Sequence, residues 1–367
     1  MSGIHQFVPL LHRWDAVGEH VRVLRDLLRD AGHASDVYTE LPDPETVSET
    51  VPYTEYEHRA APGDVLVYQL ATRSAIAGWL RTRSEPLVVN YHSITPPAFF
   101  APWSDGLARA QVACLADLAS LAPAAALGIA VSRFDEAELV AAGCPRTEVI
   151  PVANAAGPVA EPDAAELASL AAWTAGGPLW LSVGRLAPNK AHEATMAALF
   201  VYRRDVDPTA RLVVVGGPAE PHYAAALQRY RGRLGLDGAV AFRTGLSQGQ
   251  LVAHYRAAAV LVALSGHEGF GVPLVEAMRA GLPVVALAAG ATPETLGDAG
   301  VLLERSEPRR VAAAVADVLR TPGRSAALAG AGAAQVDRLG VDDAPRRLVE
   351  TLERVAEAAS GGPPPTH

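Results

Sequence analysis

Short runs of β-branched residues alternate with amphipathic segments along the whole chain of 367 residues. This alternation is typical of βαβ units, in which a helix connects each strand to the next parallel strand. Six strands are predicted in the first half, at residues 4–9, 34–38, 65–69, 87–91, 127–131 and 149–152. Between the first two, apolar residues recur at helical spacing from Val17 to Ala31 and Gly32 follows them, which predicts a glycine-capped helix. The sequence therefore predicts an α/β fold.

A second series of strand-like runs begins after a segment rich in Ala, Gly and Pro. These strands are predicted at residues 179–183, 211–215, 240–243, 260–264, 284–288 and 301–303. Two successive series of similar size predict two Rossmann-like domains, since a chain of this length usually forms two cores. We expect an N-terminal domain over 1–152, a linker region over 153–178, a C-terminal domain over 179–345, a helix over 346–359 and a disordered tail over 360–367.

The composition argues against several classes of function. Residues 1–151 contain 11 basic and 19 acidic residues, and the whole chain has a net charge of −9. Nucleic acids and anionic lipids attract clustered Lys and Arg, so an acidic first half makes a poor surface for either. No stretch is apolar enough to span a bilayer, although the apolar segment 96–103 allows weak peripheral membrane contact. Cys114 and Cys144 supply neither a disulfide framework nor a zinc cluster, and we expect a cytoplasmic protein.

Two cations follow the first strand of the second series. Residues 184–190 read GRLAPNK, which places Arg185 and Lys190 five residues apart on a turn rich in glycine and proline. Lys190 is the only lysine of the chain, while the other 30 basic residues are arginine. A guanidinium and a compact ammonium on one rigid loop suit a phosphate chain, so we predict a phosphate-binding loop here. An ordinary exposed lysine is the alternative interpretation.

A second loop, after residues 260–264, carries two glutamates. Residues 265–281 read SGHEGFGVPLVEAMRAG, with Glu268 in the loop and Glu276 in a short helix that Pro273 begins and Gly281 ends. The free amides at the start of such a helix attract phosphate or sugar oxygens. Carboxylates accept hydrogen bonds from vicinal hydroxyls, so the whole segment is typical of a nucleotide or sugar site.

Together these motifs resemble the family-four retaining glycosyltransferases. The resemblance rests on GRLAPNK, on TGLSQGQLVAHYRAA over 244–258 and on EGFGVPLVEAMRAGLPVV over 268–285, and it is strong over 179–303 and weaker over 1–151. It implies two facing Rossmann-like domains (GT-B) with an interdomain cleft. It also implies transfer of a hexose-type sugar from a nucleotide diphosphate donor to an acceptor hydroxyl, with retention at the anomeric carbon and without a metal or other cofactor.

Carried over residue by residue, the resemblance implies a role for each candidate site residue. Arg185 and Lys190 would neutralise the diphosphate, and Glu276 would hold the ribose hydroxyls. The other implied donor contacts are Gly18, Leu246, Glu268, Phe270, Gly271 and Val272. Catalysis would involve His92, Arg185, Lys190 and Glu268, and His92, Ser132 and Arg133 are the acceptor-side candidates. Only Gly18 matches the run of glycines that the family often has after the first strand.

Two alternative functions remain open. The same fold hosts nucleotide-sugar epimerases, and a non-catalytic nucleotide-sugar-binding protein would make the same phosphate contacts. The acidic first half favours a neutral or amine-bearing small molecule, or a glycan, as the acceptor. The remaining histidines, His20 among them, show no ligand spacing and are expected to be structural.

Overall fold

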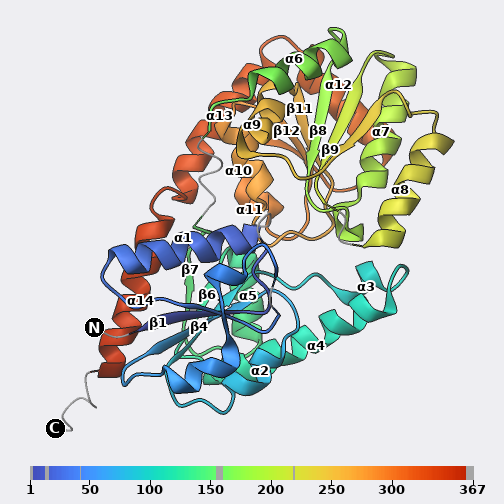
Figure 1. Ribbon diagram of the computed structural model, residues 1–367. Coiled ribbons are helices and arrows are strands. Elements are labelled where there is room, and N and C mark those ends of the chain that lie inside the picture. Colours follow the sequence, from blue (N-terminus) through green and yellow to red (C-terminus); the bar gives the residue numbers. More distant parts are fainter. Residues whose placement is uncertain (1–2, 13–15, 42, 154–159, 218–219, 361–367) are drawn as a thin grey trace. The chain divides into compact units, whose positions relative to one another are not determined.

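The computed structural model describes residues 3–12, 16–41, 43–153, 160–217 and 220–360 (Figure 1). It divides into two compact units, each with its own parallel sheet. The N-terminal unit comprises Met1–Pro97, Gly106–Asn154 and Gly340–His367, and the C-terminal unit comprises Ala98–Asp105 and Ala155–Leu339. The predicted α/β class with two Rossmann-like units is confirmed. The predicted tail falls outside the described residues, apart from its first position.

The sheet of the N-terminal unit has seven strands, and every neighbouring pair is parallel. Their order across the sheet is β3 (Val51–Pro52), β2 (Val37–Thr39), β1 (Ile4–Val8), β4 (Val65–Leu70), β5 (Leu87–Tyr91), β6 (Leu127–Ala130) and β7 (Thr147–Val149). Strand β3 was not predicted, because a two-residue edge strand ending in proline carries no alternating pattern. Strand β7 begins two residues earlier than predicted, because Thr147 and Glu148 are polar residues of an edge strand.

Helices cover both faces of this sheet. They are α1 (Ala16–Asp30), α2 (Ala75–Leu80), α4 (Asp105–Leu121), α5 (Arg133–Ala141) and α14 (Ala344–Ser360). Gly32 caps the carboxyl end of α1 as predicted, with a φ of 89° and with the His33 N–H donating to the Leu28 carbonyl at 2.9 Å. Helix α14, red in Figure 1, lies beside α1, in blue. Leu348 and Leu352 of α14 are fully buried in one cluster with Leu24 and Leu28 of α1.

The sheet of the C-terminal unit has six parallel strands. Their order is β10 (Val240–Arg243), β9 (Arg211–Val215), β8 (Leu179–Val183), β11 (Val260–Ala263), β12 (Val284–Leu287) and β13 (Gly300–Leu303). The helices are α3 (Pro97–Phe100), α6 (Ala164–Thr174), α7 (His192–Asp205), α8 (Pro221–Arg233), α9 (Gln248–Ala257), α10 (Val272–Arg279), α11 (Thr292–Leu296), α12 (Pro308–Arg320) and α13 (Arg324–Leu339). Helix α6 lies inside the segment predicted as a linker, where the Asp163 carboxylate caps it by accepting from the Glu166 N–H.

Both sheets follow the doubly wound order, in which the chain proceeds outward from the centre first in one direction and then in the other. The direction changes between β1 and β4 in the N-terminal unit, and between β8 and β11 in the C-terminal unit. Loops that leave the carboxyl ends of such strands diverge and leave room for a ligand. The fold therefore places the loops after β8 and β11 at the expected ligand-binding edge.

Candidate functional site

The loops after β8 and β11 are locked together in the C-terminal unit. The Gly266 N–H donates to the Asn189 carbonyl at 2.8 Å, and the Asn189 side-chain amide donates to the His267 carbonyl at 3.3 Å. Asn189 is buried, so its amide is an internal tie between the two loops. The two motifs recognised separately in the sequence thus form one site.

Lys190 and Glu268 form an ion pair across these loops. The ammonium nitrogen Nζ lies 2.5 Å from Glu268 Oε1, and each side chain is 16% exposed. Burial alone would raise the pKa of Glu268, but the charge and hydrogen bond of Lys190, with a hydrogen bond from Ser265, outweigh it and lower that pKa. Glu268 is therefore ionised at neutral pH, and the pair holds one positive and one negative charge ready for a polar ligand.

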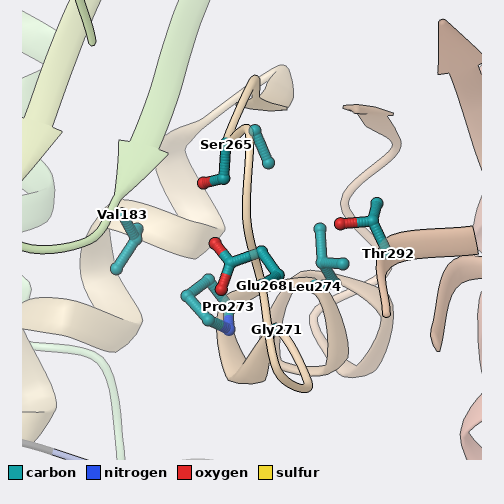
Figure 2. A pocket seen from close by; sticks show the side chains of 8 residues that line it. Val183, Ser265, Glu268, Gly271, Pro273, Leu274 and Thr292 are labelled. Atoms are coloured by element: carbon teal, nitrogen blue, oxygen red, sulfur yellow. The ribbon is translucent and has the colours of Figure 1, made fainter. Parts of the chain in front are cut away.

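A small pocket opens beside this carboxylate. Its lining residues are Val183, Ala263, Ser265, Glu268, Gly271, Pro273, Leu274 and Thr292. Figure 2 shows the Glu268 carboxylate and the Ser265 hydroxyl turned toward each other at one side of this pocket. The pocket thus combines an ionised carboxylate, two hydroxyl-bearing side chains and an apolar wall.

Helix α10 begins at the edge of the pocket. Its N-cap residue, Gly271, has a φ of 88°, and a Cβ there would lie 2.8 Å from Leu274 Cδ1, so only glycine fits without a shift. The Thr295 hydroxyl donates to the Phe270 carbonyl at 2.6 Å and fixes the loop just before the helix. The predicted helix boundaries are confirmed, including Gly281 with a φ of 68°.

Glu276 lies one turn into α10 and contacts Tyr255 of α9. The Tyr255 hydroxyl donates to Glu276 Oε2 at 2.5 Å. Burial raises the pKa of Glu276 to about 7, and the hydrogen bond from Tyr255 offsets only part of that rise. Burial also raises the pKa of Tyr255 well above its usual range, so the phenol remains a hydrogen-bond donor.

A buried histidine supports the loop that carries both cations. His192 Nε2 lies 3.1 Å from the Arg185 carbonyl, and Nδ1 lies 3.3 Å from the Ser182 hydroxyl. Burial lowers the pKa of His192 to about 4, so the ring is neutral, and Nε2 carries its proton because a carbonyl can only accept. The ring therefore fixes the backbone at Arg185, whose own side chain is exposed.

Gly216, at the end of β9, packs directly on this loop. A Cβ at Gly216 would lie 2.0 Å from the Gly184 carbonyl oxygen, whereas a Cβ at the next residue, Gly217, would meet nothing closer than Thr244 Oγ1 at 3.6 Å. We expect Gly216→Ala to lower the free energy of unfolding by about 1–3 kcal/mol, because the loop backbone must move. Urea denaturation checks this, with Gly217→Ala as the matched control near zero. Equal effects of the two substitutions would contradict the close approach.

The N-terminal unit holds the remaining candidates. His92 directly follows β5, and its Nε2 lies 2.7 Å from Gln69 Oε1. Gly18 is buried in the first turn of α1, and the rest of its predicted loop includes Asp15, which is outside the described residues. Ser132 is the buried N-cap of α5, where its hydroxyl accepts from the Asp135 N–H at 3.1 Å. Arg133 is exposed and pairs with Glu136 at 3.1 Å.

Leu246 lies between β10 and α9 in the C-terminal unit. The next residue, Ser247, forms a capping box with Gln250, which uses the Ser247 N–H in a hydrogen bond of 2.9 Å. Gly245 has a φ of 65°, so the chain turns sharply just before Leu246. The segment thus presents a fixed backbone at the same sheet edge as Lys190.

Comparison with known proteins shows which protein family the C-terminal unit resembles. Residues 171–335 match the family described as "Glycosyl transferases group 1". The C-terminal unit belongs to this family. Within the described residues, no group of three or more His, Cys, Asp or Glu is arranged to hold a metal ion. No helix found there is both long and apolar enough to cross a membrane.

Two curated relatives extend the comparison. The D-inositol 3-phosphate glycosyltransferase of Streptomyces scabiei is 35% identical over 169 residues, which are 44% of this chain and 38% of that protein. The GDP-mannose-dependent alpha-(1-6)-phosphatidylinositol monomannoside mannosyltransferase of Mycolicibacterium smegmatis is 35% identical over 164 residues, 42% of each chain. The matched region of this chain therefore corresponds to about two fifths of the length of each of these relatives.

A solved structure shares the fold over almost the whole chain. Anabaena HepE, in complex with UDP and glucose, has a TM-score of 0.72 and 22% sequence identity, covering 96% of this chain and 100% of that one. The group-1 unit and its N-terminal neighbour thus have the two-domain GT-B fold.

Several site residues of the group-1 unit were missed in the sequence. They are Asn189, His192, Tyr255 and Ser265. The first three act through a partner in another loop or element, whereas Ser265 contacts Glu268 of its own loop. A buried polar residue beside a strand end was the available signal for Asn189 and Ser265. Tyr255 had no such signal, because a tyrosine in an amphipathic helix is usually a packing residue.

Proposed function

We propose that this protein is a glycosyltransferase that moves a hexose-type sugar from a nucleoside diphosphate donor to an acceptor hydroxyl, with retention at the anomeric carbon. The observation that carries the proposal is the Lys190–Glu268 pair at the strand edge where β8 and β11 diverge, beside the amino end of α10. The membership of the C-terminal unit in the group-1 glycosyl transferases supports it. So does the fold shared with a protein solved with UDP and glucose.

The cations would serve the diphosphate of the donor. The exposed Arg185 and the Lys190 ammonium lie on a loop whose backbone His192 fixes, so little reorganisation is needed when the phosphates bind. The amides at the start of α10 add partial positive charge. These groups would stabilise the negative charge that grows on the diphosphate as it leaves.

The two glutamates would divide the rest of the donor between them. Glu276, on the helix, would accept hydrogen bonds from the ribose hydroxyls, and Glu268, in the pocket, would hold the sugar hydroxyls beside the anomeric carbon. In the reaction, the bond from the anomeric carbon to the phosphate oxygen breaks, and the electron pair stays on the diphosphate. The acceptor oxygen bonds to the same face of the sugar, and its proton passes to a phosphate oxygen of the donor. His92 would contact the donor sugar or the acceptor from the N-terminal unit.

A direct assay tests this proposal. The protein is incubated with a panel of nucleotide sugars, with and without acceptors, and free nucleoside diphosphate and product anomer are measured. Acceptor-dependent release of the diphosphate with an unchanged anomeric configuration supports the proposal. An isomerised donor would instead indicate an epimerase, and binding of the donor without any turnover would indicate a non-catalytic binding protein.

Metal independence is part of the proposal. Because Arg185, Lys190 and the α10 amides can supply the charge that a divalent cation would otherwise give to the leaving group, we expect turnover to be unchanged by EDTA. The rate is measured before and after chelation and after adding back Mg²⁺ or Mn²⁺. Loss of activity with EDTA and its recovery with either ion would refute this part.

The acceptor is proposed to be a neutral or amine-bearing small molecule or a glycan. The excess of acidic residues in 1–151 supports it, because anionic lipid headgroups would be repelled. We expect no co-sedimentation with anionic liposomes at low salt and turnover with water-soluble acceptors. Salt-sensitive binding to anionic but not neutral vesicles would overturn this. A cytoplasmic location is proposed as well, since the two cysteines are free and buried.

A further inference from the structure

A row of buried amides leads to His92 in the N-terminal unit. Gln6 of β1 and Gln69 of β4 are both fully buried, and they lie on the strands between which the sheet changes direction. Gln69 Nε2 donates to Gln6 Oε1 at 2.8 Å, and Gln69 Oε1 faces His92 Nε2 at 2.7 Å. We propose that Gln6 and Gln69 are positioning residues that fix the tautomer of His92, so that His92 offers its Nδ1 lone pair as a hydrogen-bond acceptor.

The hydrogen bonds that run from the Val21 carbonyl through Gln6 and Gln69 to His92 form a relay. The direction in which its hydrogen bonds are donated follows from the Val21 carbonyl. Gln6 Nε2 lies 2.9 Å from the Val21 carbonyl of α1, and a carbonyl can only accept, so the nitrogen of Gln6 must face Val21. The oxygen of Gln6 then faces Gln69 and can only accept from it. Gln69 therefore turns its own oxygen toward His92, and His92 Nε2 must carry the proton. One backbone carbonyl thus sets the orientation of two side-chain amides and one imidazole ring.

The His92 ring is neutral, so only one of its two nitrogens carries a proton. Burial holds the pKa of His92 well below its usual range, and the neighbouring His20 lowers it further. The rings of His92 and His20 meet edge to face, with centroids 5.1 Å apart. A neutral imidazole with its proton on Nε2 has only Nδ1 left to contact a ligand, and it can only accept there.

The neighbouring His20 also has a fixed tautomer. The Ala153 N–H donates to His20 Nδ1 at 2.9 Å, so the neutral His20 ring carries its proton on Nε2. Asn90 Nδ2 is placed 2.8 Å from His20 Nε2, but two donors cannot bond to each other, so the Asn90 amide must be turned to bring its oxygen to this position. This orientation also gives the otherwise unpaired Asn90 Oδ1 a partner. His20 can then offer neither a proton nor a lone pair to His92, which leaves Gln69 as the group that sets its tautomer.

The backbone next to His92 supports a functional reading. Ser93 has a φ of 63°, a left-handed conformation that non-glycine residues seldom adopt, and such strain clusters at ligand-binding positions. The inference rests on the proposed function for what His92 contacts. Under it, a hydroxyl of the donor sugar or of the acceptor donates to Nδ1.

Nitrogen-15 spectra of the histidine rings test the relay without any donor or acceptor. In the whole protein labelled at histidine, with His92 assigned from His92→Gln, we expect a single tautomer with the proton on Nε2. Gln69→Met should convert this signal to a mixture of tautomers. Gln6→Met should do the same, although Gln6 does not touch His92, because the Gln69 amide is then free to turn over.

The control is Gln111→Met, which removes another buried glutamine of the same unit, on α4, and should leave the His92 signal unchanged. If either single variant fails to fold, the double variant Gln6→Met with Gln69→Met removes both amides and leaves neither unpaired. In turnover assays, Gln69→Met should lower kcat about threefold to tenfold and change the donor KM less than twofold. A wild-type proton on Nδ1, or a His92 signal unaffected by Gln6→Met, would overturn the relay whether or not the protein transfers sugar.

Discussion

Replacing Lys190 by alanine should lower kcat about 100- to 1,000-fold, which corresponds to about 3–4 kcal/mol of lost transition-state stabilisation. The ammonium would face the leaving diphosphate, and its charge matters most when that group is most negative. The loop has other supports, namely His192 and Asn189, so the backbone around the site should remain in place. The measurement is release of nucleoside diphosphate at saturating donor.

The same substitution also leaves Glu268 without its partner. In the folded protein the pKa of Glu268 is lowered, so the pair contributes stability above the pKa of the unfolded chain and loses it as the pH falls through the folded value. Lys190→Ala should therefore cost about 2 kcal/mol at pH 7 and less at pH 3. Adding Glu268→Gln should restore the stability but not the turnover. Arg310→Ala, which breaks an exposed pair with Glu307, is the control near zero. Turnover within twofold of the parent would rule out the proposed role of Lys190.

Replacing Glu276 by glutamine should make the protein more stable and its donor binding weaker. The pKa of Glu276 is raised from 4.5 to about 7, so the neutral form stabilises the fold below pH 4.5 and that contribution is lost as the pH rises through 7. At pH 8 the buried charge therefore costs about 3 kcal/mol, which the uncharged glutamine avoids. Unfolding in urea at pH 8 and at pH 5 measures this, and the stability difference between variant and parent should fall from about 3 kcal/mol at pH 8 to about 1 kcal/mol at pH 5.

Donor binding should move in the opposite direction. A glutamine offers one acceptor oxygen in place of two and no charge, so we expect the donor Kd to rise about tenfold. Glu268→Gln is the comparison, because that carboxylate would lie beside the reacting carbon and should lower kcat more than it weakens binding. A higher Tm at pH 8 with unchanged donor affinity would show that Glu276 is not a ribose ligand. Equal effects of both substitutions on kcat alone would contradict the proposed division of roles.

Periodic signals in the sequence predicted most of the fold. Helix α1 and its glycine cap could be located because the apolar spacing and Gly32 both mark the same boundary. Helix α6 was missed, because residues 153–178 contain so much alanine, glycine and proline that the Asp163 cap was not recognised as a start. Short edge strands such as β3 depend on the neighbouring strand rather than on their own residues.

Contacts between residues that are far apart in the chain could not be predicted from the sequence. Lys190 and Glu268 are 78 positions apart, and their pairing depends on how two loops are fixed by Asn189. The glutamines that lead to His92 left a weaker signal, since each lies in a short strand whose residues are all buried in the structure. A polar amide in such a strand needs a partner, but the sequence does not say which one.

The position of α14 has a consequence for the order in which the chain can fold during synthesis. Its residues Leu348 and Leu352 complete the core around α1, yet they follow the whole C-terminal unit in the chain. While a ribosome is still translating residues 155–339, the helix that completes the core around α1 has not yet been made, so the N-terminal unit cannot be finished. The C-terminal unit, which receives only the short segment 98–105 from earlier in the chain, can finish first. The half that is made first is therefore the half that matures last.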